Sequence, residues 1–286
     1  MGFQINNNVA AFNAYRNLSV TQNSVSSSLE KLSSGLRINR AADDAAGLAI
    51  SEGLRSQVGG LKVAVRNAQD GISVVQTAEG ALSTSTSILQ RMRDLSVQAA
   101  NDGGLNASAK GNIQKEFNQL SEELTRIADT TQFNGKKLLD GTYNGAFQVG
   151  ANGGEQISVT ITSGGTPAGL GAVGLGVATA GATPGTDPDV PLVVDAAGTL
   201  ATIDAAIGKV STARADLGAK QNRLEMTIKN LNVSVENLSA SESRIRDTDM
   251  AAEMVSFTKS QILSQAGTAM LAQANQMGQG VLSLLR

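Results

Sequence analysis

The chain has 286 residues, a formal net charge of −2 at pH 7, and neither cysteine nor histidine. Without these residue types it has no disulfides, no thiolate or imidazole metal ligands and no Ser-His-Asp triad, so we expect no enzyme, cofactor or metal site. The balanced charge disfavours nucleic-acid binding, and no apolar run is long enough to predict a membrane span. Residues 1–8 lack the basic and apolar regions of a cleaved signal peptide.

A heptad repeat marks the N-terminal segment. Apolar residues recur every seven positions at Ala11, Leu18, Val25 and Leu32, with Leu29 on the adjoining seam. Residues 1–15 carry no charged side chain, whereas a solvated helix face normally carries lysine, glutamate or arginine. The pattern predicts a helix that is buried against other helices, including those of other copies of the chain.

Three further segments, residues 54–89, 113–127 and 200–245, carry apolar residues at alternating intervals of four and three. This spacing predicts long helices that pack along shared seams. Glu79 interrupts the first seam and Arg214 interrupts the third. An ordinary helical bundle would bury the same residues, so the pattern alone does not separate a bundle from a coiled coil.

Extended and irregular structure is predicted only in the middle of the chain. Residues 147–161 alternate apolar and polar residues on either side of Asn152-Gly153-Gly154, which predicts a β-hairpin. Residues 162–199 contain all four prolines and are rich in glycine and threonine, which indicates a loop. Gly169, Gly171 and Gly174 match a dinucleotide-binding fingerprint, but we expect no helix to start there and hence no cofactor.

The C-terminal segment mirrors the N-terminal one. Residues 260–285 carry no charge, and apolar residues recur every seven positions at Leu263, Met270, Met277 and Leu284. If the two terminal helices run antiparallel with flush ends, the pairs are Ala11 with Met277, Leu18 with Met270, and Val25 with Leu263. The fold is therefore predicted to be mainly α, with long antiparallel coiled-coil-like helices from both chain ends, a small β-hairpin and a Gly/Thr/Pro-rich central loop region.

Clusters of charge follow the first terminal helix and precede the second, at positions that we interpret as a hinge. These residues are Arg37, Arg40, Asp43, Asp44, Arg244, Arg246, Asp247 and Asp249. The antiparallel register sets Asp44 against Arg244, and Arg40 near Asp247 and Asp249. Opposite charges would then meet and fix the register, since exposed pairs add little stability.

Four segments resemble the signatures of bacterial flagellin, the subunit of the flagellar filament: LSSGLRINRAADDAAGL at 32–48, LQRMRDLSVQAAN at 89–101, TQFNGKKLL at 131–139, and the end of the chain from 242. The resemblance covers residues 1–162 and 200–286 and indicates a short form without full outer domains. It implies an inner-core domain of residues 1–42 and 246–286, an outer-core domain of 43–161 and 200–245, and a surface insertion at 162–199.

The resemblance also implies function and partners. The chain is expected to self-assemble into the hollow extracellular filament that supports swimming, and to meet an export chaperone and cap and junction proteins. Flagellins that activate the animal Toll-like flagellin receptor present an arginine, a leucine and a glutamate, which match Arg91, Leu95 and Glu116. A hook–filament junction protein is the alternative, and an enzyme displayed on a filament is a distant one.

Overall fold

The computed structural model describes residues 8–101, 103–162, 169–177 and 196–284. It is mainly helical, as predicted, and divides into two compact units. The terminal unit comprises residues 1–58 and 236–286, and the central unit comprises residues 59–235. Helices α2 (Ala45–Ala99) and α5 (Ala196–Arg246) contribute residues to both units. The inner-core and outer-core boundaries implied by the resemblance stay a prediction.

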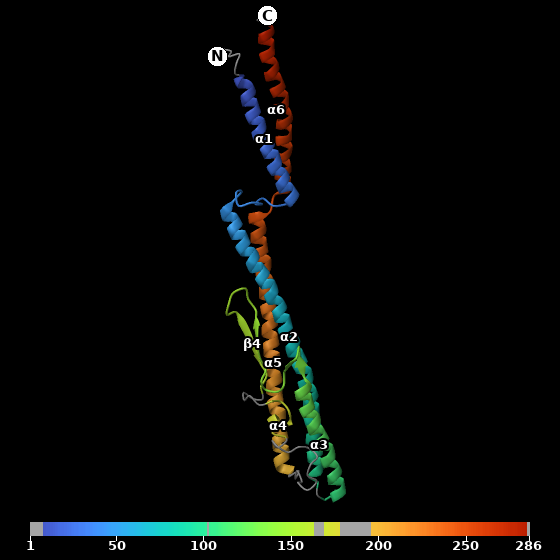
Figure 1. The fold of residues 1–286 in the computed structure, drawn as a ribbon. Helices are drawn as coiled ribbons and strands as arrows, with labels where there is room; N and C mark the ends of the chain where they lie inside the picture. The colour runs from blue at the N-terminus through green and yellow to red at the C-terminus, as the bar shows by residue number, and fades with distance from the viewer. Residues whose placement is uncertain (1–7, 102, 163–168, 178–195, 285–286) are drawn as a thin grey trace. The chain divides into compact units, whose positions relative to one another are not determined.

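In the terminal unit, α1 (Val9–Ser34) lies beside α6 (Met250–Leu284) (Figure 1). The Asn8 side chain caps α1 by accepting a hydrogen bond from the backbone N–H of Ala11. Gly35 ends the helix in the left-handed conformation, with φ of 73°, and its N–H donates to the carbonyl of Lys31. Both ends of α1 are therefore specified by residues suited to helix termini.

A short antiparallel β-bridge follows α1 within the terminal unit. Leu36 pairs with Asp247, and the N–H of Arg37 donates to the carbonyl of Arg246 at 2.7 Å. The N–H of Thr248 donates to the carbonyl of Gly35 at 3.0 Å. These bonds make α1 and α6 antiparallel neighbours, since they join the end of one helix to the start of the other.

The central unit is built on the heptad faces of its helices. Residues 59–99 of α2 pack with α3 (Ala107–Thr130) and with residues 196–235 of α5 (Figure 1). The core includes the predicted heptad residues Val75, Leu82, Leu89, Phe117, Leu124, Val210 and Leu217. The apolar stripes therefore predicted which side of each helix is buried.

Two antiparallel hairpins cover this core. The predicted hairpin forms between β3 (Asn144–Gln148) and β4 (Gln156–Thr160), and Gly154 turns the chain with φ of 90°. A second, unpredicted hairpin joins β1 (Gln132–Phe133) to β2 (Lys136–Lys137). Its turn is an Asn134-Gly135 pair with positive φ at both residues, which is a favoured two-residue hairpin turn.

The glycine-rich segment corrects one prediction. Residues 169–177 were expected to form a loop, yet Ala172–Leu175 form the short helix α4, which packs against α3. Leu170, Leu175 and Val177 are buried in the core. A Cβ on Gly174 would lie 1.8 Å from the carbonyl oxygen of Gly169, so this glycine permits a close backbone approach. Residues 163–168 and 178–195, with all four prolines, lie outside the described residues.

Candidate assembly surface

Each of the two faces on which α1 and α6 meet carries two heptad rows. One row on each helix consists of small side chains. The small rows contain Ala14, Thr21 and Ser28 on α1 and Ser260, Gly267 and Ala274 on α6. The other rows contain Ala11, Leu18, Val25 and Leu32 on α1 and Phe257, Ser264 and Leu271 on α6. Each of these side chains is buried or half-buried, and small residues let the two backbones approach closely.

This contact corrects the predicted register. Leu18 lies beside Gly267, where an added Cβ would be 3.2 Å from the Leu18 Cδ1 atom, and not beside Met270. The Nδ2 of Asn8 donates to the carbonyl of Ala274 at 2.8 Å. The predicted pairing of Leu18 with Met270 is therefore wrong.

The pairing of Val25 with Leu263 is wrong for the same reason: Leu263 lies on the other side of α6 and is 50% exposed. The stripe of large residues on α6 is not the stripe that meets α1. The side chains of Met277 and Leu284 lie outside the described part of the structure, so the pairing of Ala11 with Met277 stays a prediction.

The surface of the terminal unit carries large apolar side chains that no other part of the described structure covers. We call these residues the outward face: Phe12, Tyr15, Val20 and Leu29 of α1, and Met254, Val255, Ile262, Leu263 and Met270 of α6. Each is at least half exposed. Of the residues predicted as an assembly seam, Leu29, Leu263 and Met270 lie here, whereas Leu18 and its row lie between α1 and α6.

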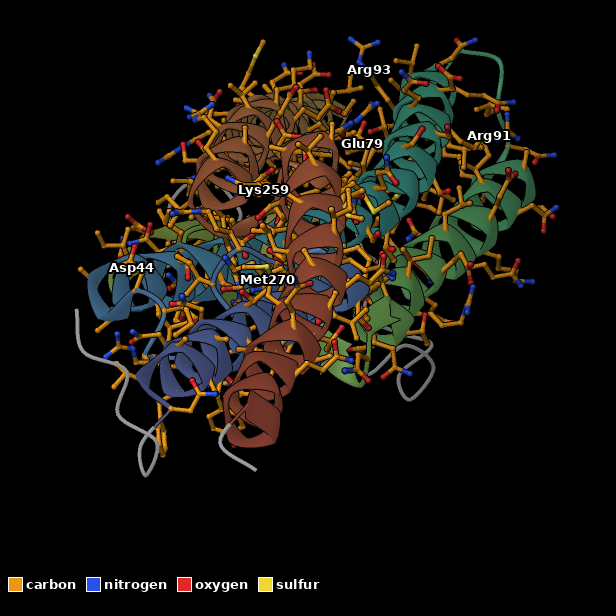
Figure 2. All side chains as sticks on the ribbon, turned by 90° about the horizontal axis from the view of Figure 1, so that it is seen from above. Asp44, Glu79, Arg91, Arg93, Lys259 and Met270 are labelled. Atoms are coloured by element: carbon orange, nitrogen blue, oxygen red, sulfur yellow. The ribbon has the colours of Figure 1, made fainter. Side chains whose placement is uncertain are left out.

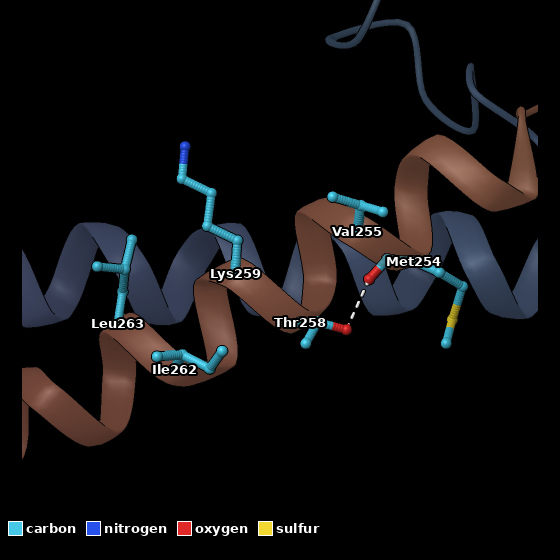
Figure 3. A pocket seen from close by; sticks show the side chains of 6 residues that line it. All are labelled: Met254, Val255, Thr258, Lys259, Ile262 and Leu263. Atoms are coloured by element: carbon cyan, nitrogen blue, oxygen red, sulfur yellow. Dashed lines mark hydrogen bonds between the residues drawn. The ribbon is translucent and has the colours of Figure 1, made fainter.

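An open hollow of about 500 Å³ lies along the outward side of α6. Met254, Val255, Ile262 and Leu263 line it with Thr258 and Lys259, and α1 lies behind the helix in this view (Figure 3). The Thr258 hydroxyl donates to the carbonyl of Met254 and so does not present a free donor to the hollow. The hollow is therefore a mainly apolar surface with one cation, Lys259, among the residues that line it.

The eight hinge charges do not form the predicted pairs. Arg40 pairs with Glu30 at 2.9 Å, and Arg246 pairs with Glu52 at 2.7 Å, both within the terminal unit. Arg37 donates to the carbonyl of Ile245. The predicted contact of Asp44 with Arg244, and that of Arg40 with Asp247 and Asp249, are wrong for this structure.

The acidic members of this group bond to nearby backbone or hydroxyl groups instead. Asp44 accepts a hydrogen bond from the N–H of Gly47 and Asp249 accepts from that of Ala251, so both cap helix starts. Asp43 accepts from the backbone N–H of Arg40, and this bond is the main reason why the pKa of Asp43 is lowered. Asp247 and Arg244 bond to hydroxyls within α5, those of Ser243 and Ser241.

Comparison with known families identifies the chain. The family model for the bacterial flagellin N-terminal helical region matches residues 5–144, and that for the C-terminal helical region matches residues 200–285. Flagellin of Bacillus subtilis is 52% identical over 99% of this chain and all of its own length. The chain belongs to the bacterial flagellins. It is therefore a structural subunit of the bacterial flagellar filament.

Other flagellins show the same likeness. The flagellar filament 33 kDa core protein of Treponema phagedenis is 50% identical over 99% of each chain. A crystal structure of Bacillus cereus flagellin is 31% identical and covers 58% of this chain and 88% of its own, with a TM-score of 0.46. Flagellins with these names form the flagellar filament, which lies outside the cell.

The residues matched to the receptor motif of flagellins do not share one surface. Arg91 on α2 pairs with Glu116 on α3 through two hydrogen bonds of 2.8 and 2.7 Å, and both side chains are about half exposed. Figure 2 marks Arg91 on the central unit together with its neighbour Arg93, which pairs with Asp204 at 2.7 Å. Leu95 is 2% exposed and packs against Ala99 and Ile113, so the expectation that it is presented on the surface is wrong.

Two other kinds of site are absent from the described residues of this flagellin. No helix there combines the length and the hydropathy needed to cross a membrane. Across the same residues, no three acidic side chains gather closely enough to hold a metal ion.

Proposed function

We propose that the terminal unit is the polymerisation element of this flagellin, and that its outward face is covered by neighbouring subunits of the filament. The observation that carries this proposal is the set of exposed large apolar side chains on α6, between Met254 and Met270. A soluble monomer gains nothing from such a surface, whereas a homopolymer buries it.

The pairing of α1 with α6 explains why the outward face is arranged in this way. Small rows between the two helices bring them close, and the large side chains of the outward face lie on the other sides. Residues 260–284 carry no charge, so covering this part of α6 with another copy buries no unpaired ion. The proposed role is structural rather than catalytic, because large apolar side chains form the outward face.

Four further partners follow from the family and belong to the same proposal. An export chaperone and the cap and junction proteins would cover α6 before or at the ends of assembly, since its outward face is exposed in the free chain. For the animal Toll-like receptor, we propose a contact through Arg91 and Glu116, whose side chains are exposed. Leu95 would then act only by supporting the helix that carries Arg91.

The experiment replaces two residues of the hollow. The variant Ile262→Gln with Leu263→Gln keeps the helix length and adds no charge, and both native side chains are at least half exposed. Its circular dichroism as a free subunit should match that of the parent. Added to filament seeds, it should stay in the supernatant after sedimentation, whereas the parent pellets.

The matched control is Thr258→Ser, which keeps the hydroxyl bonded to Met254 and removes only a methyl group from the same hollow. It should pellet as the parent does. If the double variant formed filaments with the parent's yield and critical concentration, the outward side of α6 would not be an assembly contact.

A further inference from the structure

The sulfur atoms of this chain are concentrated on the proposed assembly helix. Four of the seven methionines, at positions 250, 254, 270 and 277, fall in α6. The chain has no cysteine, histidine or tryptophan, so thioethers are its most readily oxidised side chains. An oxidant that reaches the free subunit therefore acts first on methionine.

Exposure separates the methionines into two classes. Met254 is 50% exposed and lines the hollow of α6, and Met270 is 66% exposed on the outward face (Figures 2 and 3). Met92, in contrast, is fully buried in the core of the central unit. A reagent dissolved in water therefore meets the sulfur atoms of the outward face and not that of the core.

We propose that Met254 and Met270 are oxidation sites, and that their conversion to methionine sulfoxide prevents the subunit from joining a filament. The inference rests on the proposed function, since it assumes that the outward side of α6 is buried by another copy. The oxidant is hydrogen peroxide. The thioether sulfur attacks one peroxide oxygen, the O–O bond breaks, a sulfur–oxygen bond forms, and water leaves. Sulfur is oxidised by two electrons and the peroxide is reduced by two.

The sulfoxide changes the surface in the way that matters for assembly. A flexible apolar side chain becomes a polar one with a strong hydrogen-bond acceptor. The hollow offers it no donor other than Lys259, because the Thr258 hydroxyl already donates to a carbonyl. Covering such an oxygen with the apolar face of a neighbour leaves it unsatisfied, which disfavours the contact.

The effect is reversible and confined to free subunits. Methionine sulfoxide reductases restore the thioether, with one enzyme for each sulfoxide epimer. Once a neighbour covers α6, the same sulfur atoms are shielded from the peroxide. Oxidation would therefore prevent free subunits from joining a filament and leave subunits that are already assembled unchanged.

The test uses the full-length free subunit and dilute hydrogen peroxide. Peptide mass spectrometry should find an added oxygen on Met254 and Met270 and none on Met92. In seeded assembly, the concentration of subunit left in solution should rise at least tenfold after oxidation, which corresponds to about 1.4 kcal/mol. Treatment with both reductases should return this concentration to that of the untreated chain.

The variant Met254→Leu with Met270→Leu removes both sulfur atoms and keeps the surface apolar. It should assemble as the parent does and should lose little of that ability after peroxide treatment. The control Met226→Leu removes an equally exposed sulfur of the central unit and should give no protection. If the leucine variant assembles poorly even without peroxide, the oxidised parent alone tests the inference. Its assembly should then recover after treatment with both reductases.

Two results would overturn the inference: an oxidised parent that assembles normally, or a leucine variant that is as sensitive to peroxide as the parent. Both leave the proposed function standing, provided that the untreated parent assembles. If the untreated parent did not assemble on seeds, the proposed function would fail on its own terms.

Discussion

An ion pair lies where two apolar seams of the central unit are interrupted. Arg214 on α5 reaches Glu79 on α2, with its Nε and Nη2 atoms both 2.8 Å from one carboxylate oxygen. The second oxygen, Oε2 of Glu79, is buried and has no hydrogen-bond partner. The two side chains are 38% and 36% exposed for Glu79 and Arg214. A charged pair among heptad positions permits one axial alignment of two helices and penalises others.

We expect the loss of one partner of this pair to lower the free energy of unfolding more than the loss of both. Arg214→Met leaves a half-buried carboxylate without its partner, and an unpaired buried group costs about 1–3 kcal/mol. Because more than a third of each side chain is exposed to water, we expect the lower part of this range, about 1–2 kcal/mol. Adding Glu79→Leu removes the orphaned charge, so the double variant should recover most or all of the loss.

Urea unfolding of the free subunit, followed by circular dichroism, measures both free energies of unfolding with a shared slope. The control is Arg126→Met, whose partner Glu123 lies three residues away on the surface of the same helix, and this change should leave stability nearly unchanged. The reasoning would be refuted by a double variant as unstable as Arg214→Met alone, or by a single variant that loses nothing.

Three more predictions concern single residues. Gly47→Ala should lower stability by about 1–3 kcal/mol in urea unfolding, because its Cβ would lie 2.8 Å from the Ile38 Cδ1 atom and closer still to the capping carboxylate of Asp44; an unchanged midpoint would contradict these contacts. Leu95→Ala should cost about 2–5 kcal/mol by the same assay, so a receptor assay of this variant needs a folded-fraction control, and a neutral result would show that Leu95 is not core. The lowered pKa of Asp43 means that its stabilising effect is complete above its ordinary pKa of about 4 and is lost as pH falls through the lower folded-state pKa. Asp43→Asn, which cannot titrate, should therefore show a weaker loss of stability below pH 4 than the parent, and equal acid sensitivity would exclude Asp43 as a contributor.

The long helices could be predicted from the sequence because an apolar stripe fixes both the helical period and the buried side. Leu82, Leu124 and Leu217 are buried for this reason, whatever element each packs against. The β3–β4 hairpin was predictable on the same grounds, from alternation on either side of a glycine turn.

The contact between α1 and α6 was not predictable in this way, because α6 carries two stripes with the same period of seven. Size favoured the stripe of Leu263 and Met270, but the stripe of Gly267 forms the contact, since small residues permit closer packing. The proposed role of the large stripe is contact with other copies of the chain. In the sequence, only the absence of charge from residues 260–285 indicated this role.

The partners of the hinge charges were not predictable from the antiparallel register, because groups close along the chain compete with charges on the other helix. Asp44 caps a backbone N–H three residues away, which restricts far less chain than an ion pair with Arg244 would. The helix α4 was missed because glycine and alanine carry no periodic pattern, and its contact with α3 decides its structure.

The small rows between α1 and α6 bear on how growth of the polymer starts. Only Ser28, Ser260 and Ala274 of this contact are fully buried, and the larger side chains of the second row are half-buried. The contact therefore removes little apolar area from water, and the free helix pair opens at low cost in free energy. When two free subunits collide, the helix pair of each is in the binding conformation only part of the time. Their complex therefore seldom persists. The subunits at the end of an existing filament hold the complementary surface rigid. An arriving subunit therefore does not need a second mobile surface to become ordered at the same moment. Elongation is thereby favoured over nucleation by the weakness of a contact inside the subunit.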